Sequence, residues 1–301
     1  MATQPVKVLI PLDGSQLAEH ALAYVSALRP LGLSEVEVVS VIDPVTVPAR
    51  RGHEDEERER NLLAAYQERL ADRLRMHTTL DVKTRILSGL APEAVLQEAE
   101  AYQPDYLIIS THGSSGLSRW RFGSVADKVI RGADCPTLVV GPVAAERDSW
   151  LEARLMPVFR SILVPLDGSE LAEQALHQAQ RFVEAFGAQL HLVTALVLGS
   201  MAANDAWSGA SAKLTDELMT DSGEYLERIR ARTPGLGDTT VAVRVGSPAE
   251  SLSDYIADNA IDLVIMTSHG RGGLLRAALG STTDRLLGGT APVLIVRARE
   301  E

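Results

Sequence analysis

An internal repeat constrains the fold of this chain more than any other feature. Val8–Ser15 reads VLIPLDGS, and Ile162–Ser169 reads ILVPLDGS. Two later segments return in the same order: Asp105–Ile109 as Asp262–Met266, and Gly123-Ser124 as Gly280-Ser281. The repeat predicts two copies of one domain in tandem. At 301 residues and 46% hydrophobic composition, the chain has enough apolar material for two cores.

Each half alternates short apolar runs with longer helix-like segments, which is typical of βαβ units and a parallel sheet. The runs at 106–109 and 263–266 are apolar without alternation, as expected of central strands covered on both faces. We expect strands near 6–11, 35–42, 81–87, 105–110 and 137–141, then near 160–165, 188–196, 239–245, 262–267 and 292–297. We expect helices near 16–29, 54–76, 92–102 and 123–132, then near 170–186, 211–232, 248–259 and 280–288. The predicted fold class is therefore α/β, with two tandem doubly wound five-stranded parallel-sheet domains of Rossmann-like type.

The connection between the domains is predicted from Pro142 and Pro157, which lie at either end of a segment without strand pattern. We expect domain 1 at 1–143, a linker at 144–158 and domain 2 at 159–301. Within the linker, Arg147–Leu155 can form one or two helical turns. Two further irregular segments are a charged, solvated helix start at 50–60 and a Gly/Ala/Ser-rich loop at 198–211.

Charge and cysteine content exclude several classes of function. A net charge of −11 argues against a nucleic-acid surface or an anionic-membrane surface. A single cysteine, Cys135, excludes an internal disulfide and a cysteine-based metal cluster, which suits a reducing compartment. Its setting before an apolar run indicates a residue entering a core strand, with a reactive thiol as the alternative. The N-terminus shows no signal-peptide pattern and no apolar run is long enough to span a membrane, so we expect a cytoplasmic protein.

The first candidate site segment is Pro11–Ser15, repeated at Pro165–Ser169. Ligands of open parallel sheets bind at the carboxyl ends of the strands, and this segment ends the first strand. Asp13 could accept a hydrogen bond from a ribose or hold a metal ion beside phosphates, while Gly14 allows a tight turn. The alternative is that Asp13 or Ser15 simply caps the following helix.

The second candidate segment has Gly113, then nine residues, then Gly123-Ser124, and it returns as Gly270, nine residues and Gly280-Ser281. Glycine admits positive φ and lets backbone N–H groups approach an anion, and each Gly-Ser pair opens a helix whose first N–H groups are unpaired. The segment predicts a phosphate-binding loop. A glycine-rich turn without a ligand is the alternative, because duplication would also copy an inert loop.

Two further features near these loops are the end of the second strand and a repeated histidine. Val41, with its counterpart Ala195, could offer an apolar wall and backbone groups to a base, or could belong to the core. His112 and His269 precede the two loop glycines. Neither has a second histidine or carboxylate at metal-ligand or dyad spacing, so a structural hydrogen bond is favoured over catalysis.

These residues together resemble the universal stress protein family. The resemblance is carried by both Pro-Leu-Asp-Gly-Ser segments, by Gly89–Glu93 and Gly246–Glu250, and by Thr111-His-Gly and Ser268-His-Gly leading to Gly-Ser. It covers both halves of the chain. ATP-binding members show a Gly-x2-Gly-x9-Gly-Ser/Thr loop, and this chain departs from it at the first glycine, which is Ser110 in one half and Thr267 in the other. If that position requires positive φ, a β-branched residue is costly there, whereas a strand conformation suits both.

The resemblance implies an adenine nucleotide alpha hydrolase-like fold and an ATP-binding stress-response sensor or regulator, with or without Mg²⁺. The residues that it places around one ATP are Pro11, Asp13, Val41, Ser110, Gly113, Gly123, Ser124 and Val125. Those around a second ATP are Pro165, Asp167, Ala195, Thr267, Gly270, Gly280, Ser281 and Thr282. It also implies an intrachain pseudo-dimer formed through the last strands, 137–141 and 292–297, with homodimerisation as a further option and no nucleic-acid or membrane partner.

Two alternatives stay open. One is a stress-linked interaction module whose loops bind no nucleotide. The other is a slow ATPase or autokinase with Ser124 or Ser281 as phosphate acceptors. Fast hydrolysis is not indicated, because the chain lacks the Gly-x4-Gly-Lys-Ser/Thr sequence and its lysine.

Overall fold

The chain divides into two compact units, Met1–Pro157 and Val158–Glu301. The computed structural model describes residues 5–43, 53–77, 79–111, 123–147, 157–197, 209–268 and 280–298. In each unit, every described strand pair is parallel.

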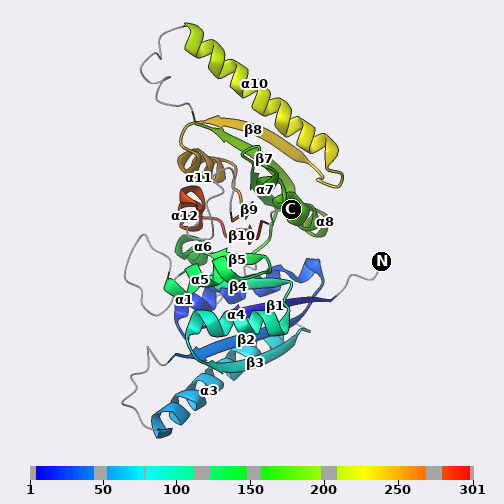
Figure 1. The fold of residues 1–301 in the computed structure, drawn as a ribbon. Coiled ribbons are helices and arrows are strands. Elements are labelled where there is room, and N and C mark those ends of the chain that lie inside the picture. The colour runs from blue at the N-terminus through cyan, green and yellow to red at the C-terminus, as the bar shows by residue number, and fades with distance from the viewer. Residues whose placement is uncertain are drawn as a thin grey trace. The chain divides into compact units, whose positions relative to one another are not determined.

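The sheet of the first unit has the order β3-β2-β1-β4-β5 (Figure 1). Its strands are β1 (Val6–Pro11), β2 (Leu33–Ile42), β3 (Asp81–Ser88), β4 (Tyr106–Ser110) and β5 (Thr137–Val140). The chain moves from β1 through β2 to β3 and then returns to the other side of β1. The carboxyl ends of β1 and β4 are therefore the switch point, where such sheets bind ligands.

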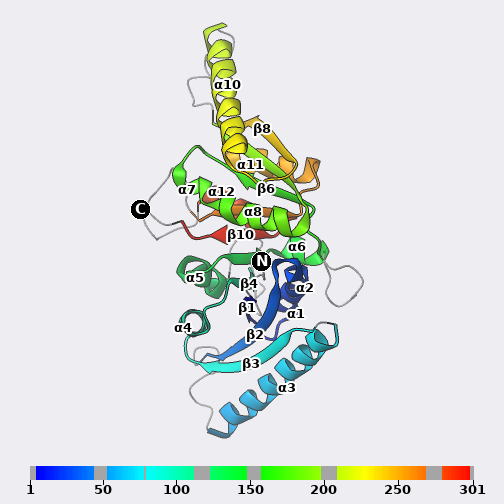
Figure 2. The ribbon, with the colours of Figure 1, turned by 90° about the vertical axis from the view of Figure 1, so that its right-hand side faces the viewer.

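Helices cover both faces of this sheet, with α4 and α5 on one face and α1 and α2 on the other (Figure 2). The helices are α1 (Gln16–Glu19), α2 (Ala23–Ala27), α3 (His53–His77), α4 (Ala91–Tyr102), α5 (Ser124–Gly132) and α6 (Pro142–Arg147), and the 3₁₀ turns are η1 (His20–Leu22) and η2 (Arg29–Leu31). The single helix predicted at 16–29 is thus divided into shorter pieces. The last of them ends at Gly32, whose φ of 91° lets the chain turn into β2.

The second unit repeats this arrangement with the order β8-β7-β6-β9-β10. Its strands are β6 (Ser161–Pro165), β7 (Gln189–Leu196), β8 (Thr239–Val245), β9 (Leu263–Thr267) and β10 (Val293–Val296), and its helices are α7 (Glu170–Glu173), α8 (Ala175–Phe186), α10 (Gly209–Arg232), α11 (Pro248–Asp258) and α12 (Ser281–Leu287). Figure 1 shows α10 lying along the edge strand β8. The predicted fold class, two tandem doubly wound α/β domains, is confirmed.

Reciprocal hydrogen bonds, which we call the amino-edge latch, join the starts of β1 and β4 in the first unit and of β6 and β9 in the second. In the first, Lys7 N–H donates to Asp105 Oδ2 (2.8 Å) and Asp105 N–H donates to the Lys7 carbonyl (2.9 Å). In the second, Arg160 and Ser161 N–H donate to Asp262 Oδ2 and Oδ1 (2.9 and 3.2 Å), and Asp262 N–H donates to the Ser161 carbonyl (3.0 Å). The repeated Asp105 and Asp262 therefore have a structural role at the edge opposite the switch point.

Cys135 lies two residues before β5 and is half-buried. Burial raises the pKa of its thiol to about 11 from an ordinary value of 9.0. The structure thus agrees with an inert residue entering the core rather than a reactive thiol.

This difference predicts slow alkylation of Cys135 in the folded chain. At pH 8 the thiolate fraction should be about a hundredfold lower than in the unfolded chain, because the two pKa values differ by about two. Iodoacetamide labelling followed by mass spectrometry, with and without urea, measures the ratio. Equal rates in the two states would contradict the assignment.

Candidate functional site

The loop after β1 is a capped turn whose residues also lie at the switch point. Ser15 N–H donates to Asp13 Oδ1 (3.0 Å), and Ala18 N–H donates to Ser15 Oγ (3.1 Å). Gly14 has a φ of +80°, so the tight turn predicted there is present. Asp13 thus orders the turn and Ser15 caps the helix, which is the structural role weighed from the sequence.

The second copy of the loop has the same geometry with one more bond. Ser169 N–H and Ser169 Oγ donate to Asp167 Oδ1 (3.0 and 2.6 Å), and Ala172 N–H donates to Ser169 Oγ (3.2 Å). Gly168 again has a φ of +80°. Asp167 is half-buried whereas Asp13 is exposed, so the two copies differ mainly in how solvated the carboxylate is.

The first glycine of the ATP-binding pattern is replaced at no conformational cost. Ser110 is the last residue of β4 and pairs with Val140, and Thr267 is the last residue of β9 and pairs with Val296. Both have strand conformation, and neither is among the described non-glycine residues with positive φ. The condition under which Thr267 would be strained is therefore not met.

Gly123 returns the chain to the end of β4, because its N–H donates to the Thr111 carbonyl (2.8 Å). It is the N-cap of α5, with a φ of −57° and no side-chain hydrogen bond to the cap. Gly280 occupies the same position before α12, with a φ of −61°. The positive φ offered above as a reason for these glycines is therefore wrong, since any residue can adopt these angles.

Packing does not require a glycine at these two positions either. Among the described residues, the nearest neighbour of a Cβ at Gly280 would lie at 4.0 Å, and a Cβ at Gly123 would meet the Thr111 carbonyl at 3.4 Å, an ordinary contact. Ser124 and Ser281, at the first helical positions, are exposed, while Val125 and Thr282 are half-buried. What the glycines leave open is the approach to the first N–H groups of the helices.

Several predicted residues lie outside the described part of the chain, namely Gly113, Gly270, His112 and His269. Their roles stay predictions. The predicted ATP-site residues that the structure describes lie at the carboxyl edge of the sheet in their own half. They run from Pro11 to Gly123 in the first half and from Pro165 to Gly280 in the second.

The end of β2 shows how the two halves differ. Val41 and Ala195 are half-buried at the carboxyl ends of β2 and β7. In the first half the next polar residue, Asp43, accepts a hydrogen bond from Ala91 N–H at the start of α4 (3.0 Å). In the second half the corresponding residue is Val197, which is 67% exposed. The residue that follows β2 is therefore polar, and the residue that follows β7 is apolar.

Sequence reasoning missed a repeated tyrosine and glutamate pair next to the first loop. Tyr225 Oη donates to Glu173 Oε1 (3.0 Å), and Arg232 pairs with the same carboxylate. Burial, then Glu173, raises the pKa of Tyr225, with a further contribution from Asp167. The signal lay in the repeat, because Leu-Ala-Glu occurs at 17–19 and 171–173, and Tyr-x-Glu-Arg at 66–69 and 225–228.

In the first half, Tyr66 has the corresponding surroundings. Burial, then Glu19, raises the pKa of Tyr66, and the Asp13 carboxylate contributes to the rise. Each loop aspartate thus lies within electrostatic range of a half-buried tyrosine whose phenol stays protonated at neutral pH.

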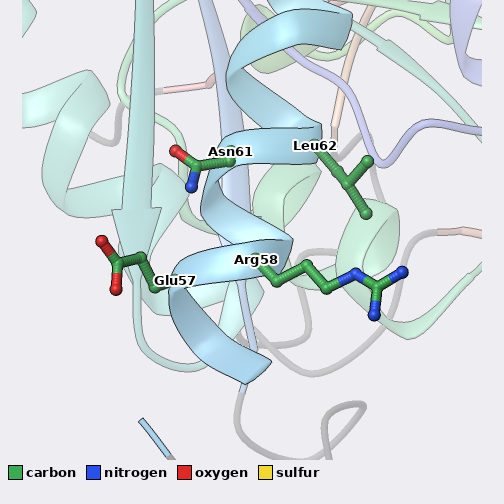
Figure 3. A pocket seen from close by; sticks show the side chains of 4 residues that line it. All are labelled: Glu57, Arg58, Asn61 and Leu62. Atoms are coloured by element: carbon green, nitrogen blue, oxygen red, sulfur yellow. The ribbon is translucent and has the colours of Figure 1, made fainter. Parts of the chain in front are cut away.

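A hollow on the first unit is formed by one stretch of α3 (Figure 3). Glu57, Arg58, Asn61 and Leu62 line it. No predicted site residue within the described ranges lines this hollow.

The described residues form neither a metal-ligand cluster nor a membrane-spanning helix. They contain no group of three or more histidine, cysteine, aspartate or glutamate side chains placed to hold a metal ion. No helix formed by them is long and apolar enough to cross a membrane.

Comparisons with known proteins agree with this arrangement. The model of the universal stress protein family matches residues 6–141 and again residues 159–297. A universal stress protein of Mycobacterium tuberculosis is 26% identical over 299 residues, which cover 96% of this chain and 96% of that protein. One of Methanocaldococcus jannaschii is 31% identical over 144 residues, which cover 44% of this chain and 81% of that protein.

Structural comparison gives the same fold for the whole chain. The crystal structure of a universal stress protein from Archaeoglobus fulgidus superposes with a TM-score of 0.69 at 18% identity, covering 98% of this chain and 97% of that one. The family model covers both halves, and a whole-length relative carries the same two halves in one chain. The chain therefore belongs to the universal stress protein family, as a tandem member with two domains.

Proposed function

We propose that this chain binds ATP at the carboxyl edge of each sheet and acts as a stress-response sensor or regulator. The observation that carries the proposal is the pair of helix-opening glycines, Gly123 and Gly280. Within the described part of the chain, neither conformation nor packing accounts for a glycine at these positions. An anion approaching backbone N–H groups does account for it.

The phosphates would lie against the first turn of α5, whose N-cap lacks a side-chain partner. Unpaired N–H groups and the helix dipole both favour negative charge there. Gly113, by the spacing of the loop, would add further N–H groups. The second half would use Gly270, Gly280 and Ser281 in the same way.

The nucleoside would lie toward the ends of β1 and β2, with the base against Val41 or Ala195. The Asp13 or Asp167 carboxylate would accept a ribose hydroxyl. A carboxylate offers about four acceptor positions. Capping the turn and binding a ribose are therefore compatible roles for one residue.

Isothermal titration calorimetry of the full chain, with ATP alone and with ATP and Mg²⁺, tests the proposal. We expect saturable binding with up to two ATP molecules per chain. One universal stress protein has been solved in complex with cAMP, so cAMP enters the titration as a second ligand. Absence of any heat of binding would favour an interaction module that binds no nucleotide.

Hydrolysis is measured separately, as phosphate released from ATP by the purified chain. Release no faster than in buffer is expected from the missing P-loop lysine. Faster release, or phosphate appearing on Ser124 or Ser281, would instead support the slow ATPase or autokinase.

Substitution of Asp167 separates its two roles. Asp167→Asn keeps an oxygen that can accept from Ser169 N–H, whereas Asp167→Ala removes it. We expect both variants to weaken ATP binding if the carboxylate contacts the ligand, and Asp167→Ala alone to lower the thermal midpoint.

The control for this pair is Ser169→Ala, which removes the helix cap and should destabilise the domain by about 1 kcal/mol. Thermal unfolding and calorimetry on the three variants give the comparison. Unchanged ATP affinity in Asp167→Asn and Asp167→Ala would leave the aspartate with a capping role alone.

Localisation and assembly complete the proposal. We expect the chain in the cytoplasm, as a homodimer or a monomer, with domain 1 at 1–143, a linker at 144–158 and domain 2 at 159–301. Sedimentation velocity gives the oligomeric state. Limited proteolysis, which should cut within 144–158, tests the boundaries.

A further inference from the structure

One buried position differs in its chemistry between the two halves. Strand register places Glu37 of β2 opposite Leu9 of β1, and His191 of β7 opposite Leu163 of β6. Because β1 and β6 are copies of one strand, Glu37 and His191 occupy the same place in the fold. Both are almost fully buried, at 6% and 5% exposure.

The helix packed on this position differs correspondingly. Counted from Gly89 and Gly246, which both have positive φ and open the turn into α4 and α11, Glu98 and Tyr255 are equivalent. Both are buried, at 7% and 3% exposure. Two carboxyl groups in the first half thus replace an imidazole and a phenol in the second.

In the first half, the surroundings of Glu37 favour its protonated form. Glu37 lies beside Glu98, and Arg85 pairs with Glu98. Glu37 Oε2 is buried without a hydrogen-bond partner among the residues that the structure describes. A buried carboxylate oxygen without a partner is costly, and two adjacent carboxylates repel each other. A proton on Glu37 relieves both problems, because the resulting O–H can donate to Glu98.

In the second half, the arrangement suits a neutral group. His191 Nδ1 lies 2.9 Å from Tyr255 Oη, and His191 Nε2 lies 3.1 Å from Ser161 Oγ. Both partners are uncharged hydroxyls. The cation nearby, Arg244, lies over the Tyr255 ring at 4.9 Å and within 3.9 Å of Asp258. The neutral imidazole therefore has both nitrogens satisfied by hydroxyl groups, and no described carboxylate is hydrogen-bonded to it.

We infer that protons act on the two halves in opposite directions: a proton on Glu37 stabilises the first half, and a proton on His191 destabilises the second.

Burial, and then the neighbouring Glu98, raise the pKa of Glu37 above its ordinary 4.5, and the smaller effects of Arg85 and Lys83 oppose this rise. The folded state binds the proton more tightly than the unfolded state. The stability that this proton contributes is complete below pH 4.5 and is lost as the pH rises through the folded-state pKa.

In the second half, protonation has the opposite effect on stability. Burial lowers the pKa of His191 below its ordinary 6.5, with Asp238 opposing the shift. The folded state therefore binds this proton less tightly than the unfolded state. Its contribution to stability is complete above pH 6.5 and is lost as the pH falls through the folded-state pKa. Acidification thus favours the first half and weakens the second.

Hydrogen exchange of the full chain, followed by mass spectrometry and corrected for intrinsic rates, tests the inference between pH 4.5 and 8. The relevant peptides cover 33–42 in β2 and 189–196 in β7. With rising pH, we expect protection to fall in the first peptide and to rise in the second. One proton changes the opening equilibrium by up to about tenfold per pH unit.

Two variants assign these slopes to the groups. Glu37→Gln should match the parent near pH 4.5 and exceed its β2 protection at higher pH. His191→Gln should remove the loss of β7 protection at low pH, whatever its overall stability.

Glu35→Gln is the matched control, because Glu35 lies on the same strand and its pKa is lowered by the hydrogen bond from Lys83. Loss of that carboxylate should reduce β2 protection above pH 4.5, opposite to Glu37→Gln. Parallel pH dependence of the two wild-type peptides, or an unchanged β2 slope in Glu37→Gln, would overturn the inference.

Discussion

Replacing Gly123 and Gly280 together by valine should weaken ATP binding by at least about a hundredfold while leaving both domains folded. Hydrogen bonds to charged groups contribute about 1.5–3 kcal/mol each, and about 2.8 kcal/mol corresponds to a hundredfold in affinity. A side chain that holds the phosphates away from the first N–H groups of the helices removes more than one such bond. We expect the fold to tolerate the change, because neither glycine has positive φ and no described atom lies closer than 3.4 Å to a Cβ built at either position.

The control for this variant is Gly223→Val on α10. No described atom lies within 4 Å of a Cβ built at Gly223, and Gly223 is not one of the predicted site residues. Calorimetric titration should give parental affinity for this control, and thermal unfolding should show cooperative transitions for both proteins. ATP affinity that survives in the double variant would remove the phosphate-loop assignment, whatever the stability data show.

Phe182→Ala should destabilise the second domain by about 3–5 kcal/mol, the range for loss of a buried phenylalanine. Phe182 is fully buried, and its ring packs on Phe159 (5.8 Å between centroids) and Phe186 (5.6 Å). No counterpart of this aromatic cluster exists in the described part of the first domain, where the repeat places Leu28 at the position of Phe182.

Calorimetric unfolding of the full chain should therefore show the second domain melting earlier and the first domain retaining its midpoint. Phe186→Ala provides the comparison, because Phe186 is half-buried and leaves a smaller cavity. An equal decrease in both midpoints would mean that the two domains unfold as one cooperative unit.

The fold could be predicted from the sequence because the repeat and the apolar runs agree. Strands predicted near 81–87 and 239–245 are found at Asp81–Ser88 and Thr239–Val245. The prediction was poorer where local chain chemistry decides. Pro30 lies in the 3₁₀ turn η2, which the expected helix at 16–29 did not foresee. Helix α6, at Pro142–Arg147, crosses the boundary predicted between domain 1 and the linker.

At the candidate site, sequence placed the loops but not their conformations. Gly14 has the positive φ that was expected, whereas Gly123 does not. A glycine in the sequence does not by itself show whether its backbone adopts a positive φ or a negative one. Whether Ser110 and Thr267 were strained depended on where each strand ends. Pairing with β5 and β10 sets where these strands end, and the sequence of β4 or β9 alone does not reveal that pairing.

The buried pairs could not be predicted, because each depends on contacts between elements distant in the chain. Repeat register alone aligns Glu37 with His191. It does not show that Glu98 and Tyr255 cover them from the helix above. The contact arises only when α4 and α11 pack on their sheets.

The amino-edge latch makes the two edges of each sheet separate modules for protein engineering. Asp105 and Asp262 fasten β4 and β9 to β1 and β6 at one edge through side-chain and backbone bonds of the same kind. The sheets of both domains are thus anchored in the same way at their amino edges. The latch residues lie outside segments 111–123 and 268–280, so exchanging those segments between the domains should leave both latches intact.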